Sequence, residues 1–477
     1  MKKWGGKMTE IKWMDEVLKR KELFLNDTCE FLQIKSVLDE DSKVEGAPFG
    51  KGIEEALYYM LHKGEKDEFV TKNVDGYAGH IEMGQGEELV GILCHVDVVP
   101  EGDGWTTDPY SADIRDGKIF ARGAIDDKGP TMAAYYAMKI VKELGLPLNK
   151  RVRMILGTDE ESNWGCVEHY FANEEMPTMG FAPDADFPII YAEKGIMGFD
   201  FVQEVSGLQT EGRPYELVSF QSGRRQNMVP DFAKAIVQTD EKEALLRTYN
   251  DYLIEKQLVG KCYIENNDVH LELEGISAHG MEPNNGKNAG LYLGAFLHTL
   301  SLDEQAKHFT SFIATYLLED TRGVNLEVAY NDDITGDLTV NAGQFSYDKA
   351  NGGKVGISLR YPVTADGEKV IATLREKSAS MNFVVMNDNN SNPHHVDKNH
   401  PLIQTLQRVY EEQTGEEATL LSIGGGTYAR SLEAGVAFGP LFPGKPEVAH
   451  QKDEYVEIDD LLKATAIYAQ AIYELAK

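Results

Sequence analysis

Two polar residues, His95 and Asp97, follow an apolar run at residues 89–94. The run is too short for a typical helix and predicts a buried strand. Because side chains alternate between the two faces of a strand, the imidazole and the carboxylate would share one side. A carboxylate that holds one ring nitrogen leaves the other directed at a metal ion. The alternative is that the two groups only satisfy each other at the end of the strand.

A second acidic position, Asp127, lies within residues 122–129, which read RGAIDDKG. This segment closes a short predicted strand at residues 118–121 and opens a predicted helix at residues 130–144. Ligands gather at such strand-to-helix turns in open α/β sheets, so we expect Asp127 to face the same site.

Further polar residues follow other predicted elements. Glu160 and Glu161 come after an apolar strand at residues 152–157. Because neighbouring carboxylates point to different sides, one can bind a metal while the other reaches a metal-bound water. Asp184 follows a short apolar segment, and His450 precedes the last helix. Each feature alone is also typical of a solvated surface, a turn or a helix cap.

Together, two histidines, His95 and His450, and three carboxylates at the ends of predicted strands form a nitrogen and oxygen ligand set. Such a set suits zinc, manganese or cobalt. The joint occurrence, more than any single residue, favours a metal centre over unrelated surface groups.

The elements that carry these residues indicate the fold. Between residues 68 and 195, short apolar strands alternate with helices, which predicts an α/β domain with a mainly parallel, twisted sheet flanked by helices. After Gly195, alternating segments such as residues 270–275 and 356–361 predict half-exposed antiparallel strands. Amphipathic helices lie between them, so we expect an inserted α+β lid domain.

The insertion predicts a discontinuous catalytic domain. The polar run at residues 387–393 is interpreted as the linker that returns from the insertion. A final amphipathic helix completes the first domain. We therefore expect residues 1–195 and 394–477 to form the catalytic domain and residues 196–393 to form the lid.

Charge and hydropathy exclude some classes of partner. The sequence has 47 basic and 78 acidic residues, a formal net charge of −31, which disfavours nucleic acid and anionic membranes. The N-terminus lacks the apolar core of a signal peptide, and no run of 18 apolar residues occurs. The four cysteines are scattered, as in reduced proteins. We expect a cytoplasmic protein.

Several blocks resemble the signatures of the co-catalytic metallopeptidases, a family that includes aminoacylases, carnosinases, glutamate carboxypeptidases and succinyl-diaminopimelate desuccinylases. They are residues 91–100, 122–129, 158–162 and 183–186, together with His450. The chain length, the large insertion and the block at residues 424–430 look most like the bacterial dipeptidases of this family.

The resemblance implies two Zn2+ ions per chain, with Mn2+ or Co2+ as alternatives, held by five ligands: His95, Asp127, Glu161, Asp184 and His450. Asp127 would bridge the two ions. His95 and Asp184 would complete one site, and Glu161 and His450 would complete the other. Glu160 would be the general base, and Asp97 would orient His95.

The resemblance also implies substrate contacts from the insertion. His279, in the block at residues 275–280, would stabilise the tetrahedral oxyanion, although local hydrogen bonding is the alternative. Arg360 would hold the C-terminal carboxylate of the substrate. Asn227 would bind substrate. Gly425 lies in a glycine run without the Lys-Ser/Thr of a phosphate loop, so its backbone would approach the substrate.

The expected function is hydrolysis of unmodified dipeptides, including β-alanyl types such as carnosine, by a metal-bridging hydroxide. A monomer is expected, because the insertion supplies its own His279. The alternatives are an aminoacylase, carboxypeptidase or desuccinylase, and a metal-dependent peptide-binding protein without turnover. A dinuclear phosphoesterase fits the metals but not the blocks around His279 and Arg360.

Overall fold

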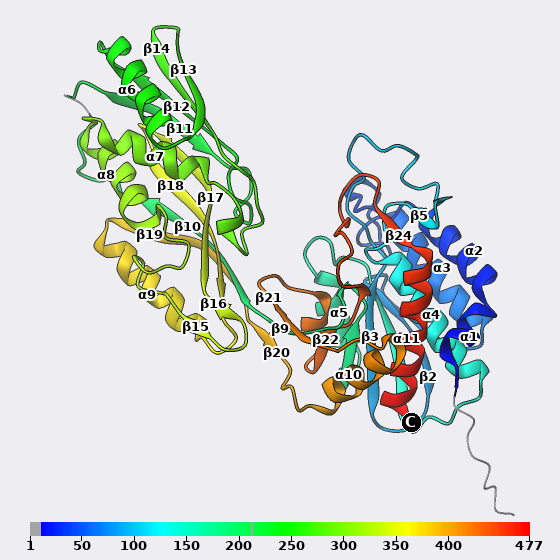
Figure 1. Ribbon diagram of the computed structural model, residues 1–477. Helices are drawn as coiled ribbons and strands as arrows, with labels where there is room; N and C mark the ends of the chain where they lie inside the picture. Colours follow the sequence, from blue (N-terminus) through cyan, green and yellow to red (C-terminus); the bar gives the residue numbers. More distant parts are fainter. Residues whose placement is uncertain (1–10, 211–212) are drawn as a thin grey trace, which may run out of the picture. The chain divides into compact units, whose positions relative to one another are not determined.

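The computed structural model describes residues 11–210 and 213–477, so the N-terminal segment searched for a signal peptide lies largely outside the described residues. The chain forms two compact units (Figure 1). Unit 1 comprises Met1–Tyr191, His395–Leu421 and Thr427–Lys477, and unit 2 comprises Ala192–His394 and Ser422–Gly426. The first break lies near Tyr191 instead of residue 195. The glycine run at residues 424–426 belongs to unit 2, although we expected it in the catalytic domain.

Unit 1 contains a mixed sheet with a parallel centre. The central strands are β6 (Arg151–Gly157), β3 (Leu89–His95), β7 (Met179–Ala182) and β22 (Gly435–Ala437), which run parallel to one another. The flanking strands β1 (Val70–Val74), β2 (Ala78–Gly84) and β9 (Ile189–Glu193) are antiparallel to their neighbours, and β20 (His394–His395) and β21 (Leu420–Ile423) complete the sheet. The expected parallel arrangement therefore holds at the centre, where the candidate residues lie.

Helices pack against this sheet and bury its apolar side chains. The bounds are α1 (Trp13–Leu18), α2 (Lys21–Leu32), α3 (Lys51–Lys66), α4 (Lys128–Glu143), α5 (Gly165–Asn173), α10 (Pro401–Thr414) and α11 (Ile458–Ala476). Figure 1 shows α4 beside α11, the last helix of the chain, and both contact β3. Both helices bury several alanines, among them Ala133 and Ala464, and such small side chains allow packed helices to approach closely.

The predicted strand at residues 118–121 exists, but it does not join the main sheet. It is β5 (Lys118–Phe120), which pairs with β4 (Asp113–Arg115) and with β24 (Tyr455–Glu457) in a small separate sheet. Two further short strands, β8 (Ala185–Asp186) and β23 (Pro440–Leu441), pair with each other. The β5–β24 pairing brings the segment after β5 next to the segment after His450.

Unit 2 is an α+β domain, which confirms the predicted fold class of the insertion. Its antiparallel sheet contains, in spatial order, β13 (Val259–Glu265), β14 (Asp268–Glu274), β12 (Phe232–Gln238), β11 (Glu216–Ser222), β17 (Thr339–Asp348), β18 (Gly352–Tyr361), β10 (Gly195–Gln203) and β19 (Phe383–Ser391). Its helices are α6 (Lys242–Glu255), α7 (Ala289–Thr299), α8 (Glu304–Phe312) and α9 (Gly367–Ser380), and β15 (Asn331–Asp332) pairs with β16 (Gly336–Asp337).

The interpretation of residues 387–393 as a linker is wrong. Most of this polar run lies in β19, an edge strand that pairs with β10. Its amide side chains support the pairing, since Gly198 N donates to Asn389 Oδ1 at 3.2 Å and Asn387 Nδ2 donates to Asp200 Oδ2 at 2.9 Å. An edge strand tolerates polar side chains because one of its sides faces solvent. No described helix combines the length and apolar character needed to cross a bilayer.

Candidate functional site

The candidate ligands of unit 1 follow neighbouring parallel strands. His95 ends β3 and pairs with Gly157 at the end of β6, while β7 ends at Ala182. Because the carboxyl ends of parallel strands meet at one edge of a sheet, the residues that follow them lie close together.

A first cluster forms around His95, which is completely buried. Its Nε2 atom lies 3.0 Å from Asp126 Oδ1 and 3.7 Å from Asp184 Oδ2. Three nitrogen and oxygen donors with this spacing fit one divalent cation.

A second cluster shares one residue with the first. His450 Nε2 lies 2.9 Å from Asp126 Oδ2 and 3.0 Å from Glu161 Oε1. The two oxygens of Asp126 therefore face different clusters, which is the arrangement of a carboxylate that bridges two cations. The donor set fits a pair of divalent cations.

Asp127 does not take the bridging position that we predicted from the sequence. Its Oδ2 atom accepts hydrogen bonds from the His95 backbone N–H at 3.1 Å and from the Thr131 hydroxyl at 3.0 Å. The residue is completely buried and belongs to none of the candidate clusters among the described residues. Asp127 thus joins α4 to β3, and Asp126 replaces it as the shared residue. Two adjacent aspartates look alike in sequence, so spacing could not choose between them.

Asp97 supports the centre in two ways. Its carboxylate accepts hydrogen bonds from the backbone N–H groups of Glu160 at 3.2 Å and Glu161 at 3.0 Å. The Nδ1 atom of His95 lies 3.0 Å from the Asp97 carbonyl oxygen and 3.5 Å from its carboxylate. Asp97 therefore holds both the imidazole and the turn that carries the two glutamates.

Burial, together with neighbouring charged groups, shifts the pKa values of the cluster. Burial, reinforced by Asp126, raises the pKa of Asp184 to about 6 and that of Glu161 to about 7. Burial also raises the pKa of Glu160 well above its usual value. Hydrogen bonds to Asp126 and Glu161 raise the pKa of His450 to about 11. The cluster therefore favours bound positive charge, whether protons or cations.

A buried ion pair that the motifs did not reveal holds Asp126 in place. Glu454 and Arg122 are both buried, with Glu454 Oε2 2.5 Å from Arg122 Nη1. The other oxygen, Oε1, accepts hydrogen bonds from the backbone N–H groups of Ile125 at 3.0 Å and Asp126 at 3.3 Å. Since Glu454 lies four residues after His450, it links the segments that carry the shared carboxylate and the second imidazole.

Tyr428 packs against the first cluster. Its ring lies edge-on to the His95 imidazole at 6.0 Å, and its hydroxyl lies 3.0 Å from Cys166 Sγ. A Cβ atom at Gly157 would lie only 1.8 Å from this hydroxyl, so the end of β6 requires glycine. Tyr428 therefore borders the first cluster, a contact that the spacing of residues in the sequence could not predict.

The four predicted substrate-binding residues lie in unit 2. His279 pairs through its backbone with Met228, and the Gly280 N–H donates to the Asn227 carbonyl at 2.7 Å. Desolvation, and secondarily the charge of Arg360, lowers the pKa of His279. The structure therefore brings His279, Asn227 and Arg360 into one region of unit 2.

The glycine run reaches the same region. A Cβ atom at Gly424, next to Gly425, would lie 3.1 Å from Met281 Cβ, and the Met281 N–H donates to His279 Nδ1 at 3.1 Å.

We expect Glu454→Gln to lower the free energy of unfolding of unit 1 by about 3 kcal/mol, because it leaves the Arg122 cation buried without its anion. Denaturant unfolding, followed by tryptophan fluorescence, measures the loss. The control is Glu457→Gln at the end of β24, three residues after Glu454, whose ion pair with Lys445 is partly exposed and should contribute less than about 1 kcal/mol. Equal losses in the two variants would contradict the positioning role of Glu454.

We expect cation binding to release protons, because Glu161, Asp184 and His450 all have raised pKa values. Lowering the pH protonates the two carboxylates, so cation affinity should fall by at least about tenfold from about pH 7.5 to about pH 5.5. Competition with a chelating dye measures the affinity, and calorimetry in two buffers counts the protons. A constant affinity over this range would contradict the assigned ligands.

Comparisons with known proteins agree with this geometry. Residues 91–474 match the family described as Peptidase family M20/M25/M40. A Bacillus subtilis protein named "Putative dipeptidase YtjP" is 56% identical over 467 residues, which cover 98% of this chain and 100% of that protein. A Staphylococcus epidermidis protein named "Putative dipeptidase" is 45% identical over 464 residues, with 97% and 99% covered.

Solved structures share the fold at low sequence identity. Aminopeptidase PepT from Bacillus cereus matches with a TM-score of 0.56 at 15% identity, covering 96% of this chain and 99% of that one. Human carnosine dipeptidase 1 matches with a TM-score of 0.53 at 16% identity, covering 97% and 98%. With a family match over most of its length and relatives that align along their whole chains, this chain belongs to the peptidase family M20/M25/M40 and is a peptide hydrolase.

Proposed function

We propose that the protein is a dipeptidase that uses two divalent cations and hydrolyses unmodified dipeptides, including β-alanyl dipeptides. The observation that carries the proposal is the position of Asp126, whose two oxygens face two separate histidine and carboxylate clusters. The name of the Bacillus subtilis relative supports the choice of dipeptides among peptide substrates.

The proposed ligands are His95, Asp126 and Asp184 for one cation, and His450, Asp126 and Glu161 for the other. Bound there, the cations would lower the pKa of a water molecule and polarise the peptide carbonyl. Nitrogen and oxygen donors suit Zn2+, with Mn2+ and Co2+ as alternatives.

Glu160 is the proposed general base. Glu160 also forms a candidate metal-binding group with His95 and Glu161, but the two clusters that share Asp126 are complete without it. Its raised pKa, caused mainly by burial, suits a group that accepts a proton from the attacking water and then delivers it to the leaving amine. Asp97 fixes the Glu160 backbone and so holds this base in place.

Unit 2 is proposed to supply the substrate-binding groups. Arg360, at the end of β18, would hold the C-terminal carboxylate, and His279 would stabilise the oxyanion. Asn227 and the backbone at Gly425 would contact the substrate. Because His279 belongs to the same chain as the metal clusters, we propose that a monomer is sufficient for activity.

We expect Glu160→Gln to reduce kcat for a dipeptide such as Ala-Ala by at least about a thousandfold, since the amide accepts no proton at neutral pH. Cation content, measured by elemental analysis, should stay the same because Glu160 is not a proposed ligand. Glu168→Gln, an exposed glutamate on α5, is the matched control and should keep full activity. Undiminished hydrolysis by the Glu160 variant would overturn the mechanism.

The substrate class is tested separately with the unaltered protein. Dipeptides with a free amine should be hydrolysed, whereas the corresponding N-acyl amino acids should not. The opposite preference would indicate an aminoacylase or a related amidohydrolase instead.

Substitutions in unit 2 should separate the roles of two residues. We expect His279→Ala to lower kcat by about a hundredfold with little change in KM, because an oxyanion forms only in the transition state. Arg360→Lys should mainly raise KM, because a carboxylate is bound before and during reaction and lysine loses the bidentate contact. Steady-state kinetics measure both.

The control for these variants is His270→Ala, which removes a histidine of β14 that stacks on Tyr263. It should leave both kinetic constants nearly unchanged. If His279→Ala behaves like this control, unit 2 does not stabilise the oxyanion through His279.

A further inference from the structure

A loop of unit 2, residues 223–230, carries two neighbouring arginines that have no acidic partner among the described residues. Arg224 and Arg225 are exposed, and neither side chain forms an ion pair or a hydrogen bond with another described residue. Acidic residues outnumber basic ones by 78 to 47 in the sequence, so acidic partners are abundant. Two such guanidinium groups are available to bind an anion.

The backbone of this loop is held firmly against the sheet of unit 2. Asn341 of β17 donates hydrogen bonds to the carbonyl oxygens of Gln226 at 2.7 Å and Met228 at 2.9 Å. Gln344 donates to the Arg224 carbonyl at 2.7 Å. A fixed backbone reduces the conformational entropy lost when the two arginines order around a ligand.

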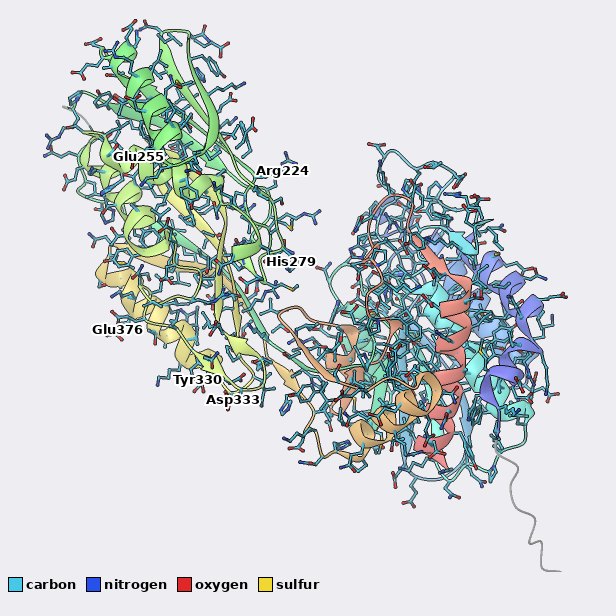
Figure 2. All side chains as sticks on the ribbon, in the orientation of Figure 1. Arg224, Glu255, His279, Tyr330, Asp333 and Glu376 are labelled. Carbon is cyan, nitrogen blue, oxygen red and sulfur yellow. The ribbon has the colours of Figure 1, made fainter. Side chains whose placement is uncertain are left out.

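The arginines also line a cavity beside the predicted substrate-binding residues. Its volume is about 290 Å³, and its lining includes Arg224, Arg225, Met228, Asp231 and Ser277. Met228 pairs with His279, and Ser277 precedes His279 by two residues. The cavity therefore borders the segments that carry Asn227 and His279. Figure 2 shows Arg224 and His279 as side chains on the outside of unit 2.

The chemistry of the lining favours a carboxylate. Two guanidinium groups and the Ser277 hydroxyl are hydrogen-bond donors, and guanidinium binds carboxylates with paired, charge-assisted hydrogen bonds. Asp231 also lines the cavity but makes no ion pair with either arginine among the described residues. Its single negative charge does not cancel the two positive ones.

We propose that this cavity binds the side-chain carboxylate of the C-terminal residue of the substrate, so that dipeptides ending in glutamate or aspartate are preferred. The inference rests on the proposed function, in which Arg360 of the same unit holds the C-terminal carboxylate. Arg360 and the cavity are linked through one segment, since the charge of Arg360 acts on His279 and the cavity is lined by Met228, which pairs with His279. The side chain of a residue whose carboxylate is held by Arg360 would then reach the arginine pair.

The test compares kcat/KM for Ala-Glu and Ala-Gln, which have nearly the same shape and differ by one charge. We expect the unaltered protein to favour Ala-Glu by about tenfold at low ionic strength, and by less as salt screens the charges. In the double variant Arg224→Gln/Arg225→Gln the ratio should fall to about one.

The matched control is Arg247→Gln. Its ratio of kcat/KM for Ala-Glu to that for Ala-Gln is compared with the ratios of the single variants Arg224→Gln and Arg225→Gln. Arg247 is an exposed arginine on α6 of the same unit, and no described carboxylate pairs with it. Its substitution removes the same charge from the unit and should leave the ratio unchanged. Thermal unfolding checks that all the variants fold.

The outcomes separate this inference from the proposed function. Hydrolysis of both peptides at equal efficiency, or a preference that the double variant keeps, would overturn the inference and leave the dipeptidase assignment intact. Failure to hydrolyse any dipeptide would overturn both. Calorimetric binding of the two peptides to the Glu160→Gln variant is an independent readout, in which equal dissociation constants would also overturn the inference.

Discussion

The crowding of carboxylates at one edge of the parallel strands is the constraint on which the centre of unit 1 depends. Buried negative charges are costly unless donors or cations surround them. The protein itself satisfies some of these groups. Asp97 and Asp127 accept backbone N–H groups, and Glu454 accepts two N–H groups and the Arg122 guanidinium. These carboxylates are therefore structural.

The other carboxylates of the centre accept no hydrogen bond from a backbone N–H or a guanidinium group of the described residues. In the part of the chain that the structure describes, Asp126, Glu161 and Asp184 face only the two imidazoles, His95 and His450. Whether a carboxylate still requires a positively charged partner therefore distinguishes the candidate metal ligands from the structural carboxylates better than its position in the sequence does. The same criterion separates Asp126 from Asp127, because among the described residues only the carboxylate of Asp127 accepts hydrogen bonds from a backbone N–H and a hydroxyl, whereas that of Asp126 contacts the two imidazoles.

Sequence patterns predicted those parts of the fold that depend on local hydrophobicity. The apolar runs before His95 and Glu160 are the buried strands β3 and β6, and the residues after them reach the site because parallel strands end at a common edge. The same patterns could not predict which segments pair when they lie far apart in the sequence. β5 leaves the main sheet because it pairs with β24, more than 300 residues later, and only that pairing places Glu454 against the backbone of Asp126.

In unit 2, the composition of polar and glycine-rich segments did not predict their structure, which depends on contacts with distant residues. The asparagine-rich run resembles a linker, but β10 supplies the backbone partners that make it the edge strand β19. The glycines at residues 424–426 gave no local signal of which unit they join, because their place follows from the close contact of Gly424 with Met281. In both cases the deciding partner lies far away in sequence.

The two units differ in the charge of the residues that face their candidate sites. The clusters of unit 1 are rich in carboxylates, whereas the corresponding region of unit 2 carries Arg360, Arg224 and Arg225. A dipeptide at neutral pH has a cationic amine and an anionic carboxylate, so groups of both signs are needed to bind it. With a net charge of −31, the protein as a whole repels the anionic end of such a peptide. Arg224 and Arg225, which pair with no carboxylate among the described residues, would offset that repulsion locally, in line with the proposed binding of the anionic end of the substrate in unit 2.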